Sequence, residues 1–540
     1  MARNILLTEN FKELIETNSI YADKTNLVKD ILNRKVVLYT RPRRFGKTLN
    51  MSMLYYFFSN QEDSVNLFKD LNIAKDAEAM KHLNKYPVIF ISLKEMTKMK
   101  IEDQIIKYQD TISDFVMNND YLIKSDKLTE AEKKQLIEYR DKCSNRMKLE
   151  SSLKDISGML YKHFNSEVMI IIDEYDVPLR YAHQYGYYDD MLDFIRPLFS
   201  SALKTNDYLF KGIMTGCLRI AKESVFTGLN NFRTDSILSY DDEVYFGFTE
   251  EEVKSILDEY NMPEKFKDIK DWYDGYLFGD KEVYNPWSAL QYIDDAKNRD
   301  NLKPSSYWAN TSGNDIIYDF LKHSDPALRN NFEKLVNGEA IEATIYPEMT
   351  YRELDDKEMI YSYLLVTGYL KATKDLGDNK YELMIPNKEI KYIYTSYFRK
   401  YIVSLQESYS SKFYNSLIKG DTNEAETELN DFLFRTVSFH DYKEDYYHGL
   451  IIGMLNDFEL LSNREFGLGR PDIVAYNPKA TLCIEIKKTD NISQLGKCAD
   501  EAISQIKDKK YVEGLKASGY RNIKAYGIAF CDKACCIKLL

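Results

Sequence analysis

The first residues in the chain whose types and spacing could do chemistry form a Gly-Lys-Thr triplet. Gly46, Lys47 and Thr48 follow a basic turn and lead into 49–58, a run with apolar residues at helical spacing. Backbone N–H groups at a helix start bind phosphate, a lysine there reaches the β- and γ-phosphates, and a threonine hydroxyl ligates Mg²⁺. The triplet predicts a nucleotide-binding loop, although three such residues also occur together by chance. The predicted loop consists of Arg43, Arg44, Phe45, Gly46, Lys47 and Thr48.

The loop departs from the common phosphate-binding pattern at one position. The pattern G-x-x-x-x-G-K-[ST] begins with glycine, and Arg41 stands there instead. Arginine lacks the freedom of glycine at positive φ, so the residues alone leave the geometry of the loop open.

An acidic pair follows the buried run 168–172 (VMIII). A carboxylate at the carboxyl end of a buried parallel strand lies at the edge of the sheet where ligands bind. We expect Asp173 to hold Mg²⁺ and Glu174 to orient or deprotonate the attacking water as a catalytic residue. The alternative is a pair of exposed acids that merely end a strand. Further on, 208–214 ends at Thr215, which would sense a γ-phosphate. Arg219 could contact phosphates or act as an arginine finger toward a neighbouring subunit, and a surface salt bridge is an equally good interpretation.

A second group of residues that could do chemistry lies near the C-terminus. Asp472, Glu485 and Lys487 have the spacing D-x₁₂-E-x-K. Because Glu485 and Lys487 are two apart on a predicted strand, their side chains point to the same face of the sheet. Two carboxylates with a lysine suit phosphodiester hydrolysis: Asp472 and Glu485 would hold Mg²⁺ or Mn²⁺, and Lys487 would position water or stabilise negative charge. The alternative is a simple salt bridge on an exposed hairpin.

Helices and strands must position these residues, and the pattern of hydrophobic residues predicts where they lie. Apolar runs predict strands separated by helices, including a charged helical insertion between 94 and 162. Thr249 and the glutamates after it predict a capping box at the start of a helical lid. A helix at 358–370 followed by a hairpin at 369–373 and 380–385 gives a winged-helix-like connector. The strands predicted in the first half are 35–40, 86–93, 168–172 and 208–214, and the C-terminal elements are a helix at 444–461, a hairpin at 473–475 and 481–486, a helix at 499–511 and a last strand at 525–530.

Several segments, taken in order, resemble the bacterial and archaeal AAA-ATPase-like proteins that carry a C-terminal PD-(D/E)XK nuclease-like domain. In that family RPRRFGKT is the usual loop, so the resemblance implies that Arg41 is a family trait. The matching segments are 21–25 (YADKT), 41–48 (RPRRFGKT), 53–58 (MLYYFF), 173–178 (DEYDVP), 216–231 (GCLRIAKESVFTGLNN), 246–251 (FGFTEE), 272–278 (WYDGYLF) and 284–290 (YNPWSAL).

The resemblance also implies roles for two further residues at the C-terminal end. In similar nucleases a helix before the hairpin contributes another glutamate to the metal site, and Glu444 matches that position best. Gln505 matches a glutamine that follows the lysine strand and could hydrogen-bond water or phosphate. Glu465 is a reserve candidate, since we expect it to lie on a strand leading into Gly467, and Lys507, Lys509 and Lys510 form a small basic patch suited to backbone phosphates.

Composition limits the class of protein. The 540 residues exceed what one hydrophobic core usually organises, and a formal charge of −12 argues against a generally basic nucleic-acid coat. Seven cysteines are a dilute, odd set that suits a reducing cytoplasm, and Cys531, Cys535 and Cys536 lack a fourth ligand at zinc spacing. We find no apolar run long enough for a bilayer and no signal-peptide core, so we expect a cytoplasmic protein without membrane contact.

Together these observations predict an α/β protein with three parts: a P-loop (AAA-like) ATPase domain at 1–245, a helical and winged-helix-like connector at 246–400 and a PD-(D/E)XK restriction-endonuclease-like domain at 401–540. ATP and Mg²⁺ are the expected cofactors, with Mn²⁺ as an alternative at the second site. We expect nucleic acid as the partner, DNA rather than RNA, and a homo-oligomer as one possible assembly. Two other functions stay open: a signalling NTPase whose nuclease-like domain only binds DNA or a partner, and a protein-remodelling ATPase without nucleic-acid contacts.

Overall fold

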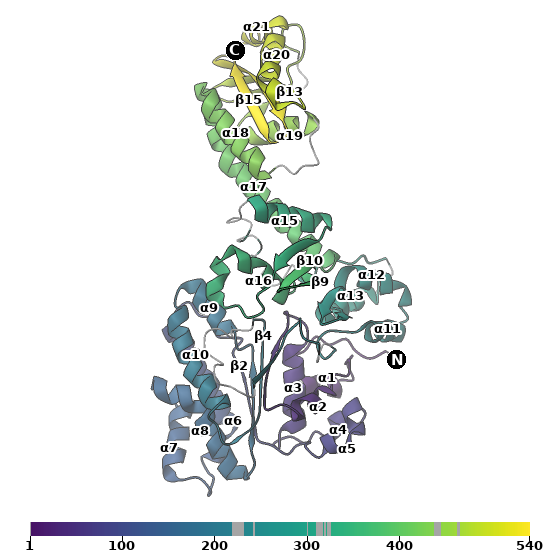
Figure 1. Cartoon of the computed structure of the whole chain (residues 1–540), viewed down its shortest axis with the longest axis vertical. Helices are drawn as coiled ribbons and strands as arrows, with labels where there is room; N and C mark the ends of the chain where they lie inside the picture. The colour runs from purple at the N-terminus through teal and green to yellow at the C-terminus, as the bar shows by residue number, and fades with distance from the viewer. Residues whose placement is uncertain are drawn as a thin grey trace. The chain divides into compact units, whose positions relative to one another are not determined.

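The computed structural model of the 540-residue chain consists of two compact units (Figure 1). The first comprises Met1–Ser312 and Lys334–Ile393, and the second comprises Gly313–Glu333 and Tyr394–Leu540. The structure describes residues 2–218, 232–240, 244–299, 301–308, 317, 320, 326–436, 444–461 and 465–540.

The first unit is built around a parallel sheet with the strand order β2-β3-β4-β1-β5 among the described residues. The four strands predicted in the first half are confirmed, and β5, beside β1, is an addition. Because all strands run in one direction, their carboxyl ends share one edge. The strands are β1 (Val36–Thr40), β2 (Val88–Ser92), β3 (Val168–Asp173), β4 (Leu209–Gly216) and β5 (Phe232–Asp235).

Helices cover both faces of this sheet (Figure 1). On one face α3 (Lys47–Phe58) lies with α1 (Phe11–Glu16) and α2 (Leu27–Leu32), near the short α4 (Val65–Phe68) and α5 (Ala77–Met80). The other face is covered by α6 (Ile101–Asn118), α7 (Glu130–Arg140), α8 (Arg146–Phe164), α9 (Val177–Tyr185) and α10 (Tyr188–Leu203). The charged segment between β2 and β3 therefore forms helices, as its patterning predicts.

The lid follows the sheet and has its own apolar core. The predicted capping box is present, because the Thr249 side chain accepts from the Glu252 N–H while the Glu252 carboxylate accepts from the Thr249 N–H. Val253, Ile256 and Leu257 are buried against later lid helices. The lid elements are α11 (Glu250–Glu259), α12 (Phe266–Tyr273), β6 (Tyr276–Phe278), β7 (Lys281–Val283) and α13 (Pro286–Ala296).

The connector completes the first unit with the predicted helix and hairpin. The hairpin turns at Asp378 and Asn379, whose φ values of 51° and 59° fit a two-residue turn between antiparallel strands. A strand not predicted, β8, joins them in the order β8-β10-β9. The helix is shorter than predicted. The elements are β8 (Ile341–Thr344), the 3₁₀ turn η5 (Tyr351–Asp355), α16 (Ile360–Val366), β9 (Lys371–Gly377) and β10 (Lys380–Met384). Helix α15 (Pro326–Asn337) is divided between the units, with its residues up to Glu333 in the second and those from Lys334 in the first.

The second unit packs helices around a mixed sheet with the order β11-β12-β13-β14-β15, in which β13 and β14 are parallel. The predicted hairpin is confirmed as β12 and β13. The predicted helix 444–461 is too long, because it ends at Met454 and β11 follows, and the predicted last strand 525–530 is followed by β15. The elements are α17 (Lys388–Lys419), α18 (Thr422–Thr436), α19 (Glu444–Met454), β11 (Glu459–Leu460), β12 (Ile473–Tyr476), β13 (Thr481–Lys488), α20 (Leu495–Asp508), α21 (Tyr511–Ala517), β14 (Ile523–Cys531) and β15 (Ala534–Leu539).

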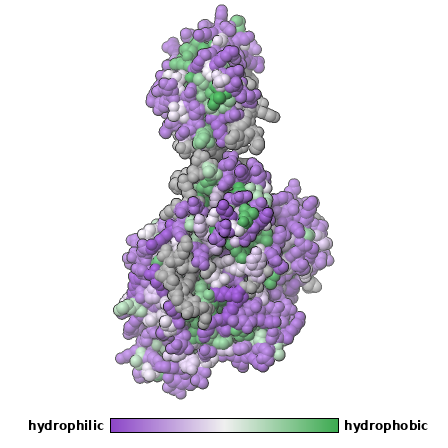
Figure 2. Space-filling view, viewed as in Figure 1, coloured by the Kyte–Doolittle hydropathy of each residue, from purple (hydrophilic) through white to green (hydrophobic). Residues whose placement is uncertain are grey.

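Hydrophilic residues cover most of the face shown in Figure 2, with hydrophobic side chains in scattered patches. Among the described helices, none combines the length and the apolar character needed to span a membrane.

Candidate nucleotide site and candidate metal site

The loop after β1 turns without a glycine at its first position. The left-handed conformations lie at Arg44 and Gly46, with φ values of 69° and 79°, so Arg41 does not make the turn. Arg41 is instead fully buried, and its Nη2 lies 2.6 Å from Oδ1 of Asp235 on β5. Its guanidinium also lies over the rings of Phe246 and Phe278 at 5.1 and 5.2 Å from their centroids. The departure from the common pattern therefore gives the loop an anchor in the core.

The lysine of the loop points back along it. Nζ of Lys47 donates to the main-chain oxygens of Arg41 and Pro42 at 3.0 and 2.9 Å, and the side chain is 5% exposed. Gly46 is the N-cap of α3, so the first N–H groups of this helix start directly after the loop. A buried ammonium held by carbonyls at a helix start is a site for an anion such as phosphate.

Asp173, at the carboxyl end of β3, accepts hydrogen bonds from two hydroxyl groups, one near the end of β4 and one in the first turn of α3. The Thr48 hydroxyl donates to its Oδ2 at 2.8 Å, and the Thr215 hydroxyl donates to its Oδ1. Asp173 is fully buried, and burial raises the pKa of its carboxyl above the ordinary value. The structure thus brings together three residues that lie on β3, β4 and α3. An oxygen-rich set with one carboxylate is the chemistry that Mg²⁺ prefers, so Thr48 and Asp173 fit the predicted ion.

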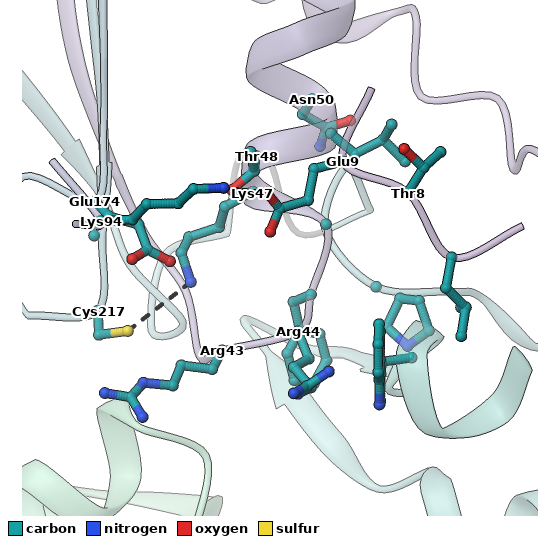
Figure 3. A pocket seen from close by; sticks show the side chains of 18 of the residues that line it. Thr8, Glu9, Arg43, Arg44, Lys47, Thr48, Asn50, Lys94, Glu174 and Cys217 are labelled. Atoms are coloured by element: carbon teal, nitrogen blue, oxygen red, sulfur yellow. Dashed lines mark hydrogen bonds and ion pairs between the residues drawn. The ribbon is translucent and has the colours of Figure 1, made fainter. Parts of the chain in front are cut away.

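Glu174 stands beside this cluster in a left-handed conformation with φ of 53°. Its backbone N–H donates to the Thr215 hydroxyl at 3.4 Å, and burial raises the pKa of its carboxyl. Its side chain lines the same cavity as Lys47 (Figure 3). A carboxylate with a raised pKa that lines the same cavity as a buried lysine is suited to accept a proton from water.

The cavity has a volume of about 670 Å³, which is in the range of nucleotide and cofactor pockets. Arg43, Arg44, Phe45 and Gly46 of the predicted loop line it, and Arg44 places its guanidinium 3.9 Å from the centroid of the Trp287 ring. The sequence reasoning missed Glu9 and Lys94, which pair at 2.8 Å in this pocket (Figure 3). A signal for Lys94 existed, because it follows the end of β2 just as the acidic pair follows β3.

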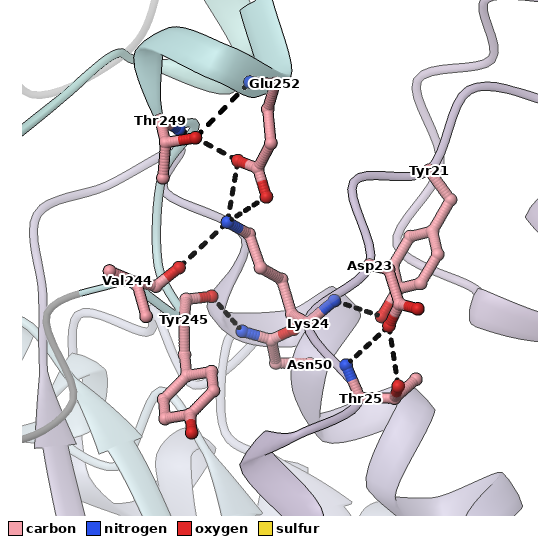
Figure 4. Close-up of polar contacts among 9 residues, drawn as sticks. All are labelled: Tyr21, Asp23, Lys24, Thr25, Asn50, Val244, Tyr245, Thr249 and Glu252. Carbon is pink, nitrogen blue, oxygen red and sulfur yellow. Dashed lines mark hydrogen bonds and ion pairs between the residues drawn. The ribbon is translucent and has the colours of Figure 1, made fainter. Parts of the chain in front are cut away.

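The segment 21–25 ties the N-terminal part of the pocket to the lid (Figure 4). Nζ of Lys24 donates to both carboxylate oxygens of Glu252 at 2.7 and 2.8 Å and to the main-chain oxygen of Val244 at 2.8 Å. Burial lowers the pKa of Lys24, and Glu252 partly offsets this. Asp23 meanwhile accepts from the N–H and the hydroxyl of Thr25. These contacts hold the pocket wall and the start of α11 together.

Asp176, for which the sequence predicted no role, binds the loop after β4. Its Oδ2 accepts from the N–H groups of Cys217 and Leu218 at 3.1 and 3.2 Å, and from the hydroxyl of Tyr351 at 3.2 Å. This loop leads toward Arg219, which lies outside the described residues, so the predicted arginine finger stays a prediction.

The second site lies at one end of the hairpin β12–β13. Glu485 is 1% exposed, and its Oε2 accepts from the Asp472 N–H at 3.4 Å. Oδ2 of Asp472 accepts from the Ile486 N–H at 2.8 Å. Lys487 Nζ lies 3.8 Å from Oε1 of Glu485, so the two side chains share a face as predicted. Gln505 on α20 donates through Nε2 to the same Oε1.

The electrostatics of this site favour a cation. Burial, together with the charge of Asp472, raises the pKa of Glu485 to about 7. A buried carboxylate beside a second carboxylate forms a donor set that Mg²⁺ or Mn²⁺ fits. Asp472 and Glu485 would hold this ion.

Two predicted candidates are not placed in this cluster. Glu444 is the first residue of α19, and its side chain lies outside the described residues. Glu465 is exposed and lies outside any strand, with an oxygen 3.7 Å from Nε of Arg470, so its predicted position on a strand is wrong. His448 contacts the site through its Nε2, which lies 3.0 Å from the main-chain oxygen of Asp472.

Comparison with known proteins finds a family model over each of the two regions that carry these sites. Residues 6–226 match a family model described as predicted AAA-ATPase, and residues 442–539 match one described as the PD-(D/E)XK nuclease superfamily. The chain is also 23% identical over 380 residues to an uncharacterized protein in the vnfD 5′ region of Azotobacter chroococcum mcd 1, which covers 69% of this chain and 64% of that protein. The chain therefore spans less than two thirds of the length of this relative. By these matches, the protein joins an AAA-ATPase-like domain at residues 6–226 to a domain of the PD-(D/E)XK nuclease superfamily at residues 442–539.

Proposed function

We propose that the first unit binds and hydrolyses ATP with Mg²⁺, and that the second unit is a Mg²⁺- or Mn²⁺-dependent nuclease acting on nucleic acid, DNA rather than RNA. The observation that carries the first part is the position of Asp173, whose carboxylate accepts from both Thr48 and Thr215 beside Lys47. The nuclease proposal rests on Glu485, which is buried between Asp472, Lys487 and Gln505.

In the first site each residue has a separate task. Lys47 would exchange its carbonyl partners for the β- and γ-phosphates, and Thr48 and Asp173 would hold Mg²⁺, which neutralises developing phosphate charge. Glu174 would take the proton from the attacking water, helped by its raised pKa. Thr215 lies between Asp173 and the Glu174 backbone, where it can sense the terminal phosphate.

In the second site the chain would supply two metal ligands and a cation. Asp472 and Glu485 would bind Mg²⁺ or Mn²⁺, which would polarise the phosphodiester and activate water. Lys487, about one third exposed, is open to solvent and would stabilise charge on the phosphate. Gln505 fixes one oxygen of Glu485, so it positions the carboxylate or hydrogen-bonds water. We infer that ATP gates this activity or drives movement of the nucleic acid, with a homo-oligomer as the form in which Arg219 would serve a neighbour.

The net charge of −12 sets how nucleic acid would be attracted. Binding must come from local groups such as Arg470, Lys487, Lys507, Lys509 and Lys510 and from the bound ion, so it is expected to be modest and to weaken with salt.

The test is incubation of the full chain with linear, circular and single-stranded substrates, with and without ATP, in Mg²⁺ and in Mn²⁺. Glu485→Ala should abolish cleavage and leave ATP hydrolysis, and Lys47→Ala should abolish ATP hydrolysis. Glu501→Ala on α20 removes an exposed carboxylate from the same domain and serves as the control. A mobility shift without products in every arm would support the binding-only alternative and contradict the nuclease proposal. Cleavage unchanged in Glu485→Ala would contradict the site.

A further inference from the structure

The lid and the start of helix α17 meet at a junction of several polar contacts. Four successive residues contact the lid there: Pro386 and Asn387, which precede α17, and Lys388 and Glu389, its first two residues. Asn387 donates through Nδ2 to the main-chain oxygen of Asp274 at 2.7 Å, and Lys388 Nζ lies 2.7 Å from Oδ2 of Asp271. A Cβ at Gly275, where φ is 82°, would lie 2.3 Å from the Pro386 oxygen, so glycine alone permits this approach.

Glu389 is the centre of this junction and is fully buried. Its Oε1 accepts three hydrogen bonds: from the Ser288 hydroxyl at 3.0 Å, the Tyr307 N–H at 2.8 Å and the Trp308 N–H at 2.9 Å. Burying a carboxylate is costly unless such donors compensate, so the position of Glu389 is closely tied to these three groups.

Ser288, the lid residue whose hydroxyl donates to Glu389, is adjacent to Trp287, which contacts Arg44 of the nucleotide loop. Ser288 follows Trp287 in the first turn of α13, and the Arg44 guanidinium lies 3.9 Å from the centroid of the Trp287 ring. Phosphate bound at the loop would change the charge facing Arg44, and hence this cation–π contact. A shift of Trp287 would move Ser288, because the two are adjacent in the first turn of α13, where the N-cap Asn285 accepts from the Ser288 N–H.

Helix α17 connects this junction to the second unit along the chain. It runs from Lys388 to Lys419, and its residues from Tyr394 onward belong to the unit that carries Asp472 and Glu485. We infer that Glu389 is a positioning residue that transmits the state of the nucleotide site, through Arg44, Trp287 and Ser288, to helix α17. This inference rests on the proposed nucleotide binding. It adds a route by which that binding would act on α17, and this route uses a residue, Glu389, that belongs to neither site.

The experiment measures amide hydrogen exchange of the full chain with and without a non-hydrolysable ATP analogue and Mg²⁺. In the wild type, the analogue should slow exchange in three places: the loop 41–48, the start of α13 and the first turns of α17. In Glu389→Ala and Ser288→Ala, the response of the loop and of α13 should remain, while that of α17 should fall by about fivefold or more, a typical size for coupling between sites.

Two further variants separate transmission from simple structural support. Glu389→Gln keeps an oxygen that can accept the same three hydrogen bonds, so it should restore the α17 response. Tyr392→Ala removes an exposed side chain, 54% accessible, one turn further along α17 and should behave as the wild type. Ser288→Ala deletes one hydroxyl and leaves both amide donors to Glu389, so it should fold even if Glu389→Ala does not.

The outcomes are distinguishable. A wild-type protein whose loop 41–48 shows no protection by the analogue contradicts the proposed function itself. Protection of the loop without a change in α17, or an α17 response that persists in both Glu389→Ala and Ser288→Ala, overturns the inference and leaves nucleotide binding intact.

Discussion

Arg41 and Asp235 form an ion pair in which Nη2 and Oδ1 are 2.6 Å apart and neither side chain is exposed. The pair joins the start of the nucleotide loop to β5, the strand at the edge of the sheet beside β1. The guanidinium also bonds to the main-chain oxygens of Thr40 and Asp235. The loop is therefore fixed at its first residue by charge and by hydrogen bonds.

Removing one partner of this pair should destabilise the first unit strongly. Arg41→Ala leaves the buried Asp235 carboxylate without its main cation, which typically costs about 3–5 kcal/mol. Urea unfolding of the variant measures this loss. Arg41→Met combined with Asp235→Leu removes both charges and should cost clearly less than Arg41→Ala. A loss under about 1 kcal/mol for Arg41→Ala would show that the pair is not a significant anchor.

Glu174→Gln should separate nucleotide binding from hydrolysis. The amide cannot accept a proton, so we expect kcat to fall by about 10²- to 10⁴-fold, while the affinity for an ATP analogue stays nearly constant. Glu167→Gln, at the opposite end of β3 and exposed, is the matched control. Because burial raises the pKa of Glu174, the wild-type rate should increase with pH over a range above that of an ordinary carboxylate. A variant with normal kcat would exclude Glu174 as the base.

The buried carboxyl of Glu389 should make stability fall as pH rises. Burial raises its pKa from the ordinary value of 4.5 to about 7. Below pH 4.5 both folded and unfolded states bind the proton. Between pH 4.5 and 7 the unfolded state loses it first, so stability declines, and above pH 7 the full penalty of about 3 kcal/mol is present. Glu389→Gln removes this dependence, so the Tm difference between variant and wild type should grow from pH 5 to pH 7.5. A constant difference would contradict the raised pKa.

Gln505→Ala should weaken metal binding at the second site without removing a ligand. Its amide fixes one oxygen of Glu485, and loss of such a partner typically lowers metal affinity by about 10- to 100-fold. The measurement is the Mg²⁺ concentration that gives half-maximal cleavage. Ser504→Ala on the same helix removes an exposed hydroxyl that bonds within α20, and it should leave this concentration unchanged. If the two variants respond alike, Gln505 has no part in positioning Glu485.

The four predicted strands of the first half follow from local patterns, since each of β1 to β4 is a largely apolar run with a polar or charged residue at or next to its carboxyl end. β5, which reads FRTD, lacks such a pattern. The same logic places Asp173, Thr48 and Thr215 together, because parallel strands share one carboxyl edge. At the second site the two-residue spacing of Glu485 and Lys487 predicts their common face.

Contacts between distant segments were not predictable in this way. Arg41 pairs with Asp235, 194 residues away, and Lys24 pairs with Glu252, 228 residues away. No periodicity relates such positions. The helix predicted at 444–461 was too long, because apolar content alone does not distinguish a helix from a helix followed by the short edge strand β11. Within segments 272–278 and 284–290, Asp274, Gly275 and Ser288 hold the start of α17, and no local pattern indicates these contacts.

The order in which the chain builds its two units constrains how such proteins can be recombined. The chain leaves the first unit after Ser312, contributes 313–333 to the second, returns for Lys334–Ile393 and then leaves again. A single cut after Ile393 therefore keeps the whole first unit but separates 313–333 from the rest of the second. A cut after Ser312 instead removes Tyr351 and Glu389, which contact Asp176 and Ser288, from the first unit. Exchange of the C-terminal domain between relatives would need a junction inside α17, together with a matched 313–333 segment. Genetic shuffling of this architecture should accordingly be rarer than for domains joined by one linker.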